Sequence, residues 1–314
     1  MLQERTVMSF EEKYSYKGWP NCIRLATNNH ELIITTDVGP RVIRYGTIGG
    51  QNLFREFDDQ AGKMGGNDFR LYGGTRFWHG PEASPRCYYP DNNKVSYDWD
   101  GKTVKLTQDT EPTTGMQKEV SISFGRDNSV GILYRIYNRT LWDIKLAPWI
   151  LSIMNLSGRG IVPQETFQLW EEKLTPARPL VLWAYTTMDD ARWIWGRKYI
   201  QLKQSPEVNT RQKLGILNSL GWAAYYLNGQ VFVKRYGFNL DSDYADFGVN
   251  TEIYTDQDIF EVETLGEFKA IKPGSYCEHM ENWYLFDETL EESEKSIDEK
   301  LPGLLEKTVK PGSK

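Results

Sequence analysis

The chain has 314 residues, enough to bury a sizeable core, and its composition is that of a soluble globular protein. Its formal net charge is -6 and it has no long basic block, which disfavours a nucleic-acid partner. No apolar run approaches the ~20 residues that cross a bilayer, so no membrane partner is expected.

Cysteine usage and the N-terminal residues indicate the compartment. Cys22, Cys87 and Cys277 are odd in number and far apart, with no metal-ligand spacing, which is typical of a reducing environment. The charged N-terminus has no apolar signal core, so we expect a cytoplasmic protein. We also expect no metal and no other cofactor. A periplasmic location would require a signal segment that had been removed.

Short β-prone runs separated by Gly, Pro and Asn make up most of the chain. The hairpin dipeptide Asn228-Gly229 joins two of them, and no internal repeat is evident. This pattern predicts one all-β domain over residues 1–314, an antiparallel β-sandwich or barrel. The expected strands are Ile23–Leu25, Leu32–Thr36, Arg41–Tyr45, Val95–Trp99, Val104–Gln108, Gln117–Phe124, Gly131–Tyr137, Ala147–Met154, Leu180–Tyr185, Trp193–Trp195, Tyr199–Leu202, Gly221–Tyr226, Val231–Tyr236, Thr251–Tyr254, Ile259–Leu265 and Ser275–Leu285.

Two stretches depart from this pattern. Residues 46–90 are Gly-rich and predict a long loop, which in a compact domain is usually functional. From about residue 288 the sequence is rich in Glu, Lys and Leu, which predicts a charged amphipathic C-terminal helix interrupted at Pro302-Gly303.

A pair of carboxylates on one strand is the clearest chemical signal. The run Ile259–Leu265 places Glu261 and Glu263 on one face of the strand, and Phe260 and Val262 on the other. Carboxylates two residues apart on a strand lie roughly 6–7 Å apart. If they are sheltered from water, one pKa rises and the other group stays ionised, as a general base requires. The equally open alternative is a solvated sheet face.

Several segments occur in a particular order between Ile23 and Leu285. They are HELIITTDVGPRVIRYGTIGGQNLF, LYGGTRFWHGPE, GMQKEVSISF, the asparagine of RIYNRT, LAPWILSIM and FEVETLGEFKAIKPGSYCEHMENWYL. In this order they resemble the galactose-mutarotase-like (aldose 1-epimerase-like) superfamily of carbohydrate-active proteins, and in particular an uncharacterised bacterial branch of it. The resemblance implies an all-β supersandwich, here with a short C-terminal helix.

The resemblance also implies roles for particular residues. Glu263 stands at the position of the catalytic base, and Arg76 in the Gly-rich segment stands at that of a substrate-contacting arginine. The family's general acid is a histidine at the start of a central strand, where this chain has Trp149. An indole cannot donate a proton to a ring oxygen as an imidazolium does, so epimerase activity requires another histidine.

The chain has three histidines, of which two are candidates for that acid. His79 lies among aromatic residues in the Gly-rich segment, and His279 lies on a strand that follows Glu263. With an unperturbed pKa near 6.5, either could donate a proton around neutral pH if it lay opposite Glu263. The alternative for each is a hydrogen-bonded structural residue, and His79 is preferred over His279 as a ligand contact.

Three residues of the Gly-rich segment are candidates for substrate binding. Arg76 is followed by Trp78 and Glu82, and this set combines a guanidinium that forks to hydroxyls with a flat apolar ring face. It suits a sugar or sugar acid. An arginine stacked on a tryptophan within an ordinary loop would have the same sequence.

The remaining substrate-binding candidates lie elsewhere in the chain. Trp149 could be the floor of a sugar site or a core residue, and Arg41 could bind substrate or lie on the polar face of a strand. Asn250, Glu252 and Glu261 are the last three candidates. A hairpin would bring the strand that holds Asn250 and Glu252 beside Glu261.

The sequence therefore predicts a protein whose partner is a sugar or oligosaccharide. The leading hypothesis is aldose 1-epimerase-like proton shuttling at the anomeric carbon, with Glu263 as base and His79 or His279 as acid. One alternative is a polysaccharide lyase or glycoside hydrolase that uses Glu82 with Glu263 on a larger glycan. The other is a non-catalytic sugar-binding protein. The sugar, its anomer and the oligomeric state are left open.

Overall fold

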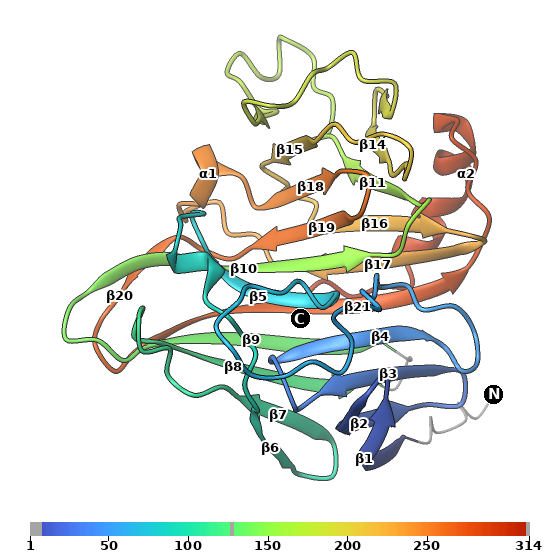
Figure 1. Ribbon diagram of the computed structural model, residues 1–314. Coiled ribbons are helices and arrows are strands. Elements are labelled where there is room, and N and C mark those ends of the chain that lie inside the picture. Colours follow the sequence, from blue (N-terminus) through green and yellow to red (C-terminus); the bar gives the residue numbers. More distant parts are fainter. Residues whose placement is uncertain (1–7, 126–128, 312–314) are drawn as a thin grey trace.

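A ten-stranded antiparallel sheet forms one layer of the fold (Figure 1). The computed structural model describes residues 8–125 and 129–311. In spatial order the strands are β13 (Trp193–Trp195), β14 (Tyr199–Lys203), β11 (Arg159–Pro163), β16 (Trp222–Leu227), β17 (Gln230–Tyr236), β21 (Tyr276–Asp287), β9 (Val130–Asn138), β8 (Met116–Phe124), β7 (Thr103–Thr107) and β6 (Ser96–Trp99).

A seven-stranded antiparallel sheet forms the second layer. Its spatial order is β12 (Leu180–Leu182), β15 (Gln212–Ile216), β18 (Thr251–Thr255), β19 (Phe260–Leu265), β10 (Ile144–Met154) and β20 (Lys269–Ile271). The remaining strand, β5 (Gly74–Gly80), pairs with β10 on the side away from β19.

A smaller N-terminal sheet and three short helical segments complete the described chain. The sheet has four strands, β1 (Ser9–Tyr16), β2 (Trp19–Ala26), β3 (His30–Thr35) and β4 (Arg41–Thr47). The helical segments are the 3-10 turn η1 (Arg86–Tyr88), α1 (Ala245–Gly248) and α2 (Glu294–Leu305). No helix among residues 8–125 and 129–311 is both long and apolar enough to span a membrane.

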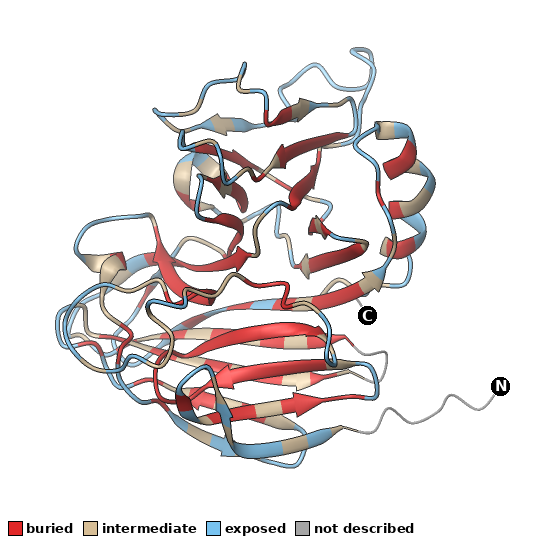
Figure 2. Cartoon of the chain, turned by 45° about the vertical axis from the view of Figure 1, so that its right-hand side comes forward, coloured by how far each residue is buried: buried red, intermediate tan, exposed pale blue. Residues whose placement is uncertain are grey.

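The main core lies where the inner faces of the sheets meet. On β8 and β9 every second residue is buried, as expected for strands with one face on a core. Side chains from both large sheets, such as Phe77, Ile150 and Val262 of one and Val120 and Ile132 of the other, belong to a single apolar cluster. Figure 2 shows these inner strands buried and the connecting loops exposed.

The all-β sandwich expected from the sequence is confirmed, and so is the Asn228-Gly229 hairpin between β16 and β17. Both hairpin residues have positive φ, 46° and 81°, the conformation that favours this dipeptide. The C-terminal helix is present but is not interrupted, since α2 continues through Pro302 to Leu305. Its buried residues Ile297, Leu301 and Leu304 pack against the ten-stranded sheet. That residues 1–314 form one domain stays a prediction.

One expectation about the Gly-rich region was wrong. Residues 46–90 are not a loop throughout, because they contain the buried strand β5. The glycines that suggested a loop permit a close approach of chains instead. Gly74 has φ +67°, and a Cβ there would lie 2.2 Å from the carbonyl oxygen of Val42 on β4.

Candidate functional site

One face of the seven-stranded sheet collects most of the predicted site residues. Glu263 pairs in register with Leu151 of β10 and with Glu252 of β18, and Leu151 pairs with Arg76 of β5. Since directly paired residues point to the same side of a sheet, these side chains share a face. We call it the Glu263 face; its polar and aromatic members are Arg76, Trp78, Trp149, Lys213, Glu252, Glu261 and Glu263.

Glu263 has one carboxylate oxygen held and one without a partner. Its Oε2 accepts a hydrogen bond of 2.8 Å from Trp149 Nε1 and another of 2.9 Å from Lys213 Nζ. Its Oε1 has no hydrogen-bond partner among the described residues. The side chain is 0% exposed, so the two donors fix the carboxylate in one orientation.

Lys213 links two carboxylates in this buried site. Its ammonium lies 2.8 Å from Glu252 Oε2 and 2.9 Å from Glu263 Oε2, and it is within 4.8 Å of the Trp149 ring and 4.7 Å of the Trp183 ring. Burial opposes its charge, but the two carboxylates outweigh that effect and raise the pKa of Lys213 well above its usual value. We therefore treat it as a permanent cation.

The neighbouring carboxyl groups hold their protons more tightly than usual. Burial raises the pKa of Glu261 well above its ordinary value, and the charge of Glu263 adds to this. Burial also raises the pKa of Glu252, although Lys213 opposes the shift. Burial likewise raises the pKa of the half-buried Asp246. The face thus combines an anchored Glu263 side chain with neighbouring carboxyl groups whose pKa values are raised.

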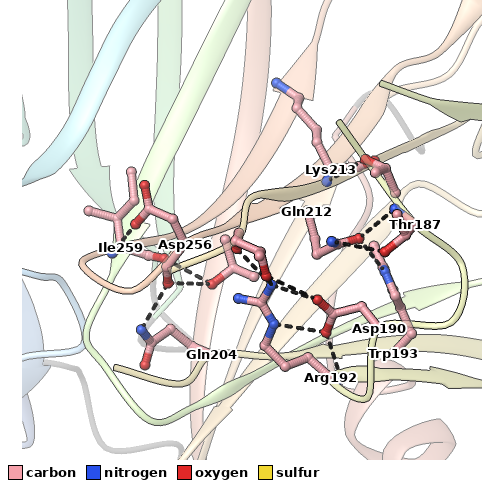
Figure 3. Close-up of polar contacts among 12 residues, drawn as sticks. Thr187, Asp190, Arg192, Trp193, Gln204, Gln212, Lys213, Asp256 and Ile259 are labelled. Atoms are coloured by element: carbon pink, nitrogen blue, oxygen red, sulfur yellow. Dashed lines mark hydrogen bonds and ion pairs between the residues drawn. The ribbon is translucent and has the colours of Figure 1, made fainter. Parts of the chain in front are cut away.

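A polar network fastens the segment that covers Lys213 (Figure 3). Gln212 Oε1 accepts bonds from the Thr187 amide at 3.1 Å and from Trp193 Nε1 at 2.9 Å. In Figure 3 the Lys213 side chain extends away from this network, as alternation along β15 requires. The network thereby holds the segment containing Trp183 against the strand that supplies the cation.

Arg76 lies on the Glu263 face, and its guanidinium forms an ion pair with Asp91. Its Nη2 is 3.2 Å from Asp91 Oδ1, and Arg41 Nη2 is 2.6 Å from Asp91 Oδ2. Burial opposes ionisation of Asp91, but the two arginines hold its pKa at about 2. The guanidinium of Arg76 stacks on Phe69 at 4.2 Å and on Trp78 at 5.2 Å, so the predicted Arg–Trp pair is present.

Arg41 does not project from a polar strand face. It is 1% exposed, and its Nη1 donates to the carbonyl oxygens of Leu71 and Gly73 at 2.7 and 2.6 Å. Its third partner is Asp91, whose carboxylate it shares with Arg76, and its role in substrate binding stays a prediction.

Asn250 and Glu82 differ from the rest of the predicted binding set. Asn250 is 0% exposed, and its side chain exchanges hydrogen bonds of 2.7 and 3.1 Å with the Asn218 main chain, so it is a structural link. Glu82 is exposed after the end of β5 and accepts a hydrogen bond from Tyr88. Its charge adds to the raised pKa of Glu261, after the larger effects of burial and of Glu263.

His79, one of the two histidines that could have lain opposite Glu263, does not lie there. His79 pairs with Pro148 on β10, whereas its neighbour Trp78 pairs with Trp149, so His79 points to the inner side of the sheet. Burial, assisted by the charges of Lys118 and Arg86, lowers its pKa to about 3. A group with this pKa is not an imidazolium at neutral pH.

His279 is also on the inner side. Its Nε2 lies 3.1 Å from Thr264 Oγ1, and Thr264 alternates with Glu263 along β19. Thr264 in turn bonds to Glu281, which pairs with Lys234 at 2.9 Å. Burial lowers the pKa of His279 to about 4. Neither candidate histidine therefore lies on the Glu263 face.

Sequence reasoning missed Lys213, Asp246 and Asp91. Lys213 is on β15, which was not among the expected strands, and its two carboxylate partners come from β18 and β19. Asp246 follows the buried Ala245 in α1 with φ 50°, a left-handed conformation that is rare for a residue other than glycine. Among the described residues, no group of three or more His, Cys, Asp or Glu has a metal-binding arrangement.

Comparison with known structures supports the fold, whereas comparison by sequence finds no relative. No family profile and no curated protein matches the chain. Solved structures do match over most of its length. A TPR-domain containing protein from Parabacteroides distasonis has a TM-score of 0.60 at 14% identity, covering 91% of this chain. The match covers 54% of that protein, so this chain spans about half its length.

Two further matches are galactose mutarotase-like proteins. The one from Lactobacillus casei has a TM-score of 0.54 at 10% identity and covers 84% of this chain and 100% of the other. The one from Clostridium acetobutylicum has a TM-score of 0.54 at 12% identity and covers 90% and 99%. The chain thus has the galactose mutarotase-like β-sandwich fold, as the sequence resemblance indicated.

Proposed function

We propose that the chain binds a sugar at the Glu263 face and catalyses aldose 1-epimerase-like proton transfer at the anomeric carbon. The observation that carries the proposal is the state of Glu263. Its Oε2 is held by Trp149 and Lys213, while Oε1 has no partner among the described residues and is free to accept a proton. The indoles on the same face suit stacking on a pyranose.

The proton donor in this proposal is Glu261 rather than a histidine. Its raised pKa keeps a proton available, and it is 8% exposed, whereas Glu252 is 1% exposed and bound to Lys213. Glu263 takes the proton of the anomeric hydroxyl while Glu261 protonates the ring oxygen, and the C1–O5 bond breaks. After rotation about C1–C2, both transfers reverse and close the other anomer, which restores both side chains.

The test compares Glu263→Gln and Glu261→Gln by polarimetry on D-galactose and D-glucose. Loss of one partner in the proton transfer should lower the rate by about 10²-fold or more. Tryptophan fluorescence titration with the same sugars separates binding from turnover. Full activity in Glu263→Gln would remove Glu263 from the role, and full activity in Glu261→Gln would remove Glu261. His279→Asn should keep its activity, because this residue lies on the inner side.

A non-catalytic sugar-binding protein is the second candidate. It is favoured by the burial of Glu263, which is 0% exposed, and by the placement of both candidate histidines away from the Glu263 face. It would give saturable fluorescence quenching with no change in the rate of mutarotation. Hydrolysis or lyase chemistry with Glu82 and Glu263 stays a prediction, and a panel of polysaccharides assayed for new reducing ends tests it.

A further inference from the structure

A separate cavity lies on the inner side of β5, away from the Glu263 face. It has a volume of about 320 Å³ and is bordered by the start of β8, the start of β10 and the segment after β5. Its polar lining consists of His79, Arg86, Thr113 and Thr114. Its apolar lining consists of Pro85, Met116, Ile144 and Leu146.

His79 is a buried polar side chain without partners at this cavity. It is 1% exposed, and neither Nδ1 nor Nε2 has a hydrogen-bond partner among the described residues. A neutral imidazole carries one N–H donor and one lone-pair acceptor, and burying both unpaired is unfavourable. Such a group in a native fold calls for an explanation, and a ligand in the cavity that it lines provides one.

Arg86 supplies a positive charge that pairs with no carboxylate of the described residues. No ion pair involves it in the described part of the chain, and its buried Nε has no hydrogen-bond partner there. Its Nη2 donates to the carbonyl oxygen of Pro81, which fixes the guanidinium. The nearby Lys118, in contrast, is paired with Glu111 at 2.6 Å. The unmatched charge near His79 is therefore that of Arg86.

We propose that this cavity binds a small monocarboxylate with a compact apolar body. The carboxylate accepts N–H bonds from Arg86 and His79, and the apolar body packs against Met116, Ile144 and Leu146. An apolar cleft with few convergent polar groups is the usual form of a small-molecule site, and this volume is at the lower end of the range of about 300–1,000 Å³. The proposal is independent of the sugar site, because alternation along β5 separates the two.

Benzoate is the probe, with benzamide as its neutral counterpart and inorganic phosphate as an anion without an apolar body. By calorimetry we expect saturable benzoate binding, at least about tenfold weaker binding of benzamide, and no phosphate binding. Arg86→Gln should weaken benzoate binding at least about tenfold, while the exposed Arg139→Gln should not change it. Arg139 is a matched control, since it bonds to Gln117 outside the cavity.

Imidazole NMR of the wild-type protein gives a second readout that does not depend on a folded His79 variant. The chain has three histidines, so the resonances are few, and benzoate should shift one of them, assigned to His79 by its loss in His79→Gln. If that variant does not fold, the imidazole shift in Arg86→Gln must still require at least about tenfold more benzoate than in wild type. Benzoate bound equally by Arg86→Gln, equal affinity for benzamide, or no saturable binding would each overturn the proposal.

Discussion

The indole Nε1 of Trp149 donates a 2.8 Å hydrogen bond to Glu263 Oε2, and neither residue is more than 2% exposed. Trp149 occupies the position where the sequence resemblance implies a general-acid histidine. The residue there is a permanent donor that orients the carboxylate, and it cannot exchange a proton with a substrate. The acid, if the protein is an epimerase, must come from another group on the Glu263 face.

Trp149→Phe tests the strength of this hydrogen bond. The variant keeps an aromatic ring but leaves the buried carboxylate with one donor fewer. We expect the free energy of unfolding to fall by about 1–3 kcal/mol, as for loss of a hydrogen bond to a charged group. Urea denaturation followed by circular dichroism measures it.

Trp78→Phe is the matched control on the same face. Trp78 is 6% exposed and its Nε1 has no partner among the described residues, so the same change of side chain removes no hydrogen bond. It should destabilise the protein less than Trp149→Phe does. Equal losses in the two variants would mean that packing, and not the bond to Glu263, accounts for the effect.

Lys213→Met removes the cation between Glu252 and Glu263. Breaking a buried ion pair from one side leaves uncompensated charge, so we expect a loss of about 3–5 kcal/mol at pH 8. The loss should be smaller at pH 5, because protonation of a carboxylate removes the unpaired charge. Urea unfolding at both pH values measures the difference.

Lys145→Met serves as the control for this experiment. Lys145 pairs with Asp243 at 3.2 Å, but both side chains are about half or more exposed, at 49% and 76%. Exposed ion pairs contribute about 0–1 kcal/mol. A Lys213→Met protein as stable as Lys145→Met would show that the buried carboxylates do not depend on their cation.

How far the sequence predicts this site depends on whether a relationship is local. Alternation within Ile259–Leu265 is a local pattern, and it correctly placed Glu261 and Glu263 together on one face. The partnership of Lys213 with Glu263 spans 50 residues and passes through the ladders β15–β18 and β18–β19. No local pattern specifies that register, so the cation could not be predicted from it.

The prediction for the Gly-rich segment was wrong for a different reason. Arg76 and Trp78 were recognised as candidates, but the glycines before them indicated a loop, and a loop gives no alternation. Once β5 is recognised as a strand, the opposite direction of His79 follows directly. The error about His79 was therefore an error about secondary structure.

Glu261→Gln tests the raised pKa of this carboxyl group. A folded pKa above the unfolded value of about 4.3 means that the folded state binds the additional proton. The resulting stability is fully present below about pH 4.3 and is lost as the pH rises through the folded pKa. Glutamine mimics the protonated acid at every pH, so the variant should lack this loss.

Urea unfolding of wild type and Glu261→Gln at pH 5, 6.5 and 8 measures the effect. The variant should gain stability relative to wild type as the pH rises, by about 1.4 kcal/mol for each pH unit over which wild-type Glu261 stays protonated in the fold. Glu278→Gln is the control, because Glu278 is exposed and pairs with Arg135. A constant difference between wild type and Glu261→Gln across the pH range would contradict the assignment of a bound proton.

The two inner histidines should remain neutral throughout the physiological range. Burial lowers the pKa of His79 to about 3 and that of His279 to about 4. Because these folded values lie below the unfolded value of about 6.5, their contribution to stability is present above pH 6.5 and is lost as the pH falls through the folded values.

Imidazole resonances followed by NMR from pH 5.5 to 8 should show no titration of either residue. The same protein in concentrated urea should show histidines titrating near pH 6.5. A folded-state midpoint near 6.5 for His279 would contradict its lowered pKa. It would not change its position, because its hydrogen bond to Thr264 places it on the side of β19 away from Glu263.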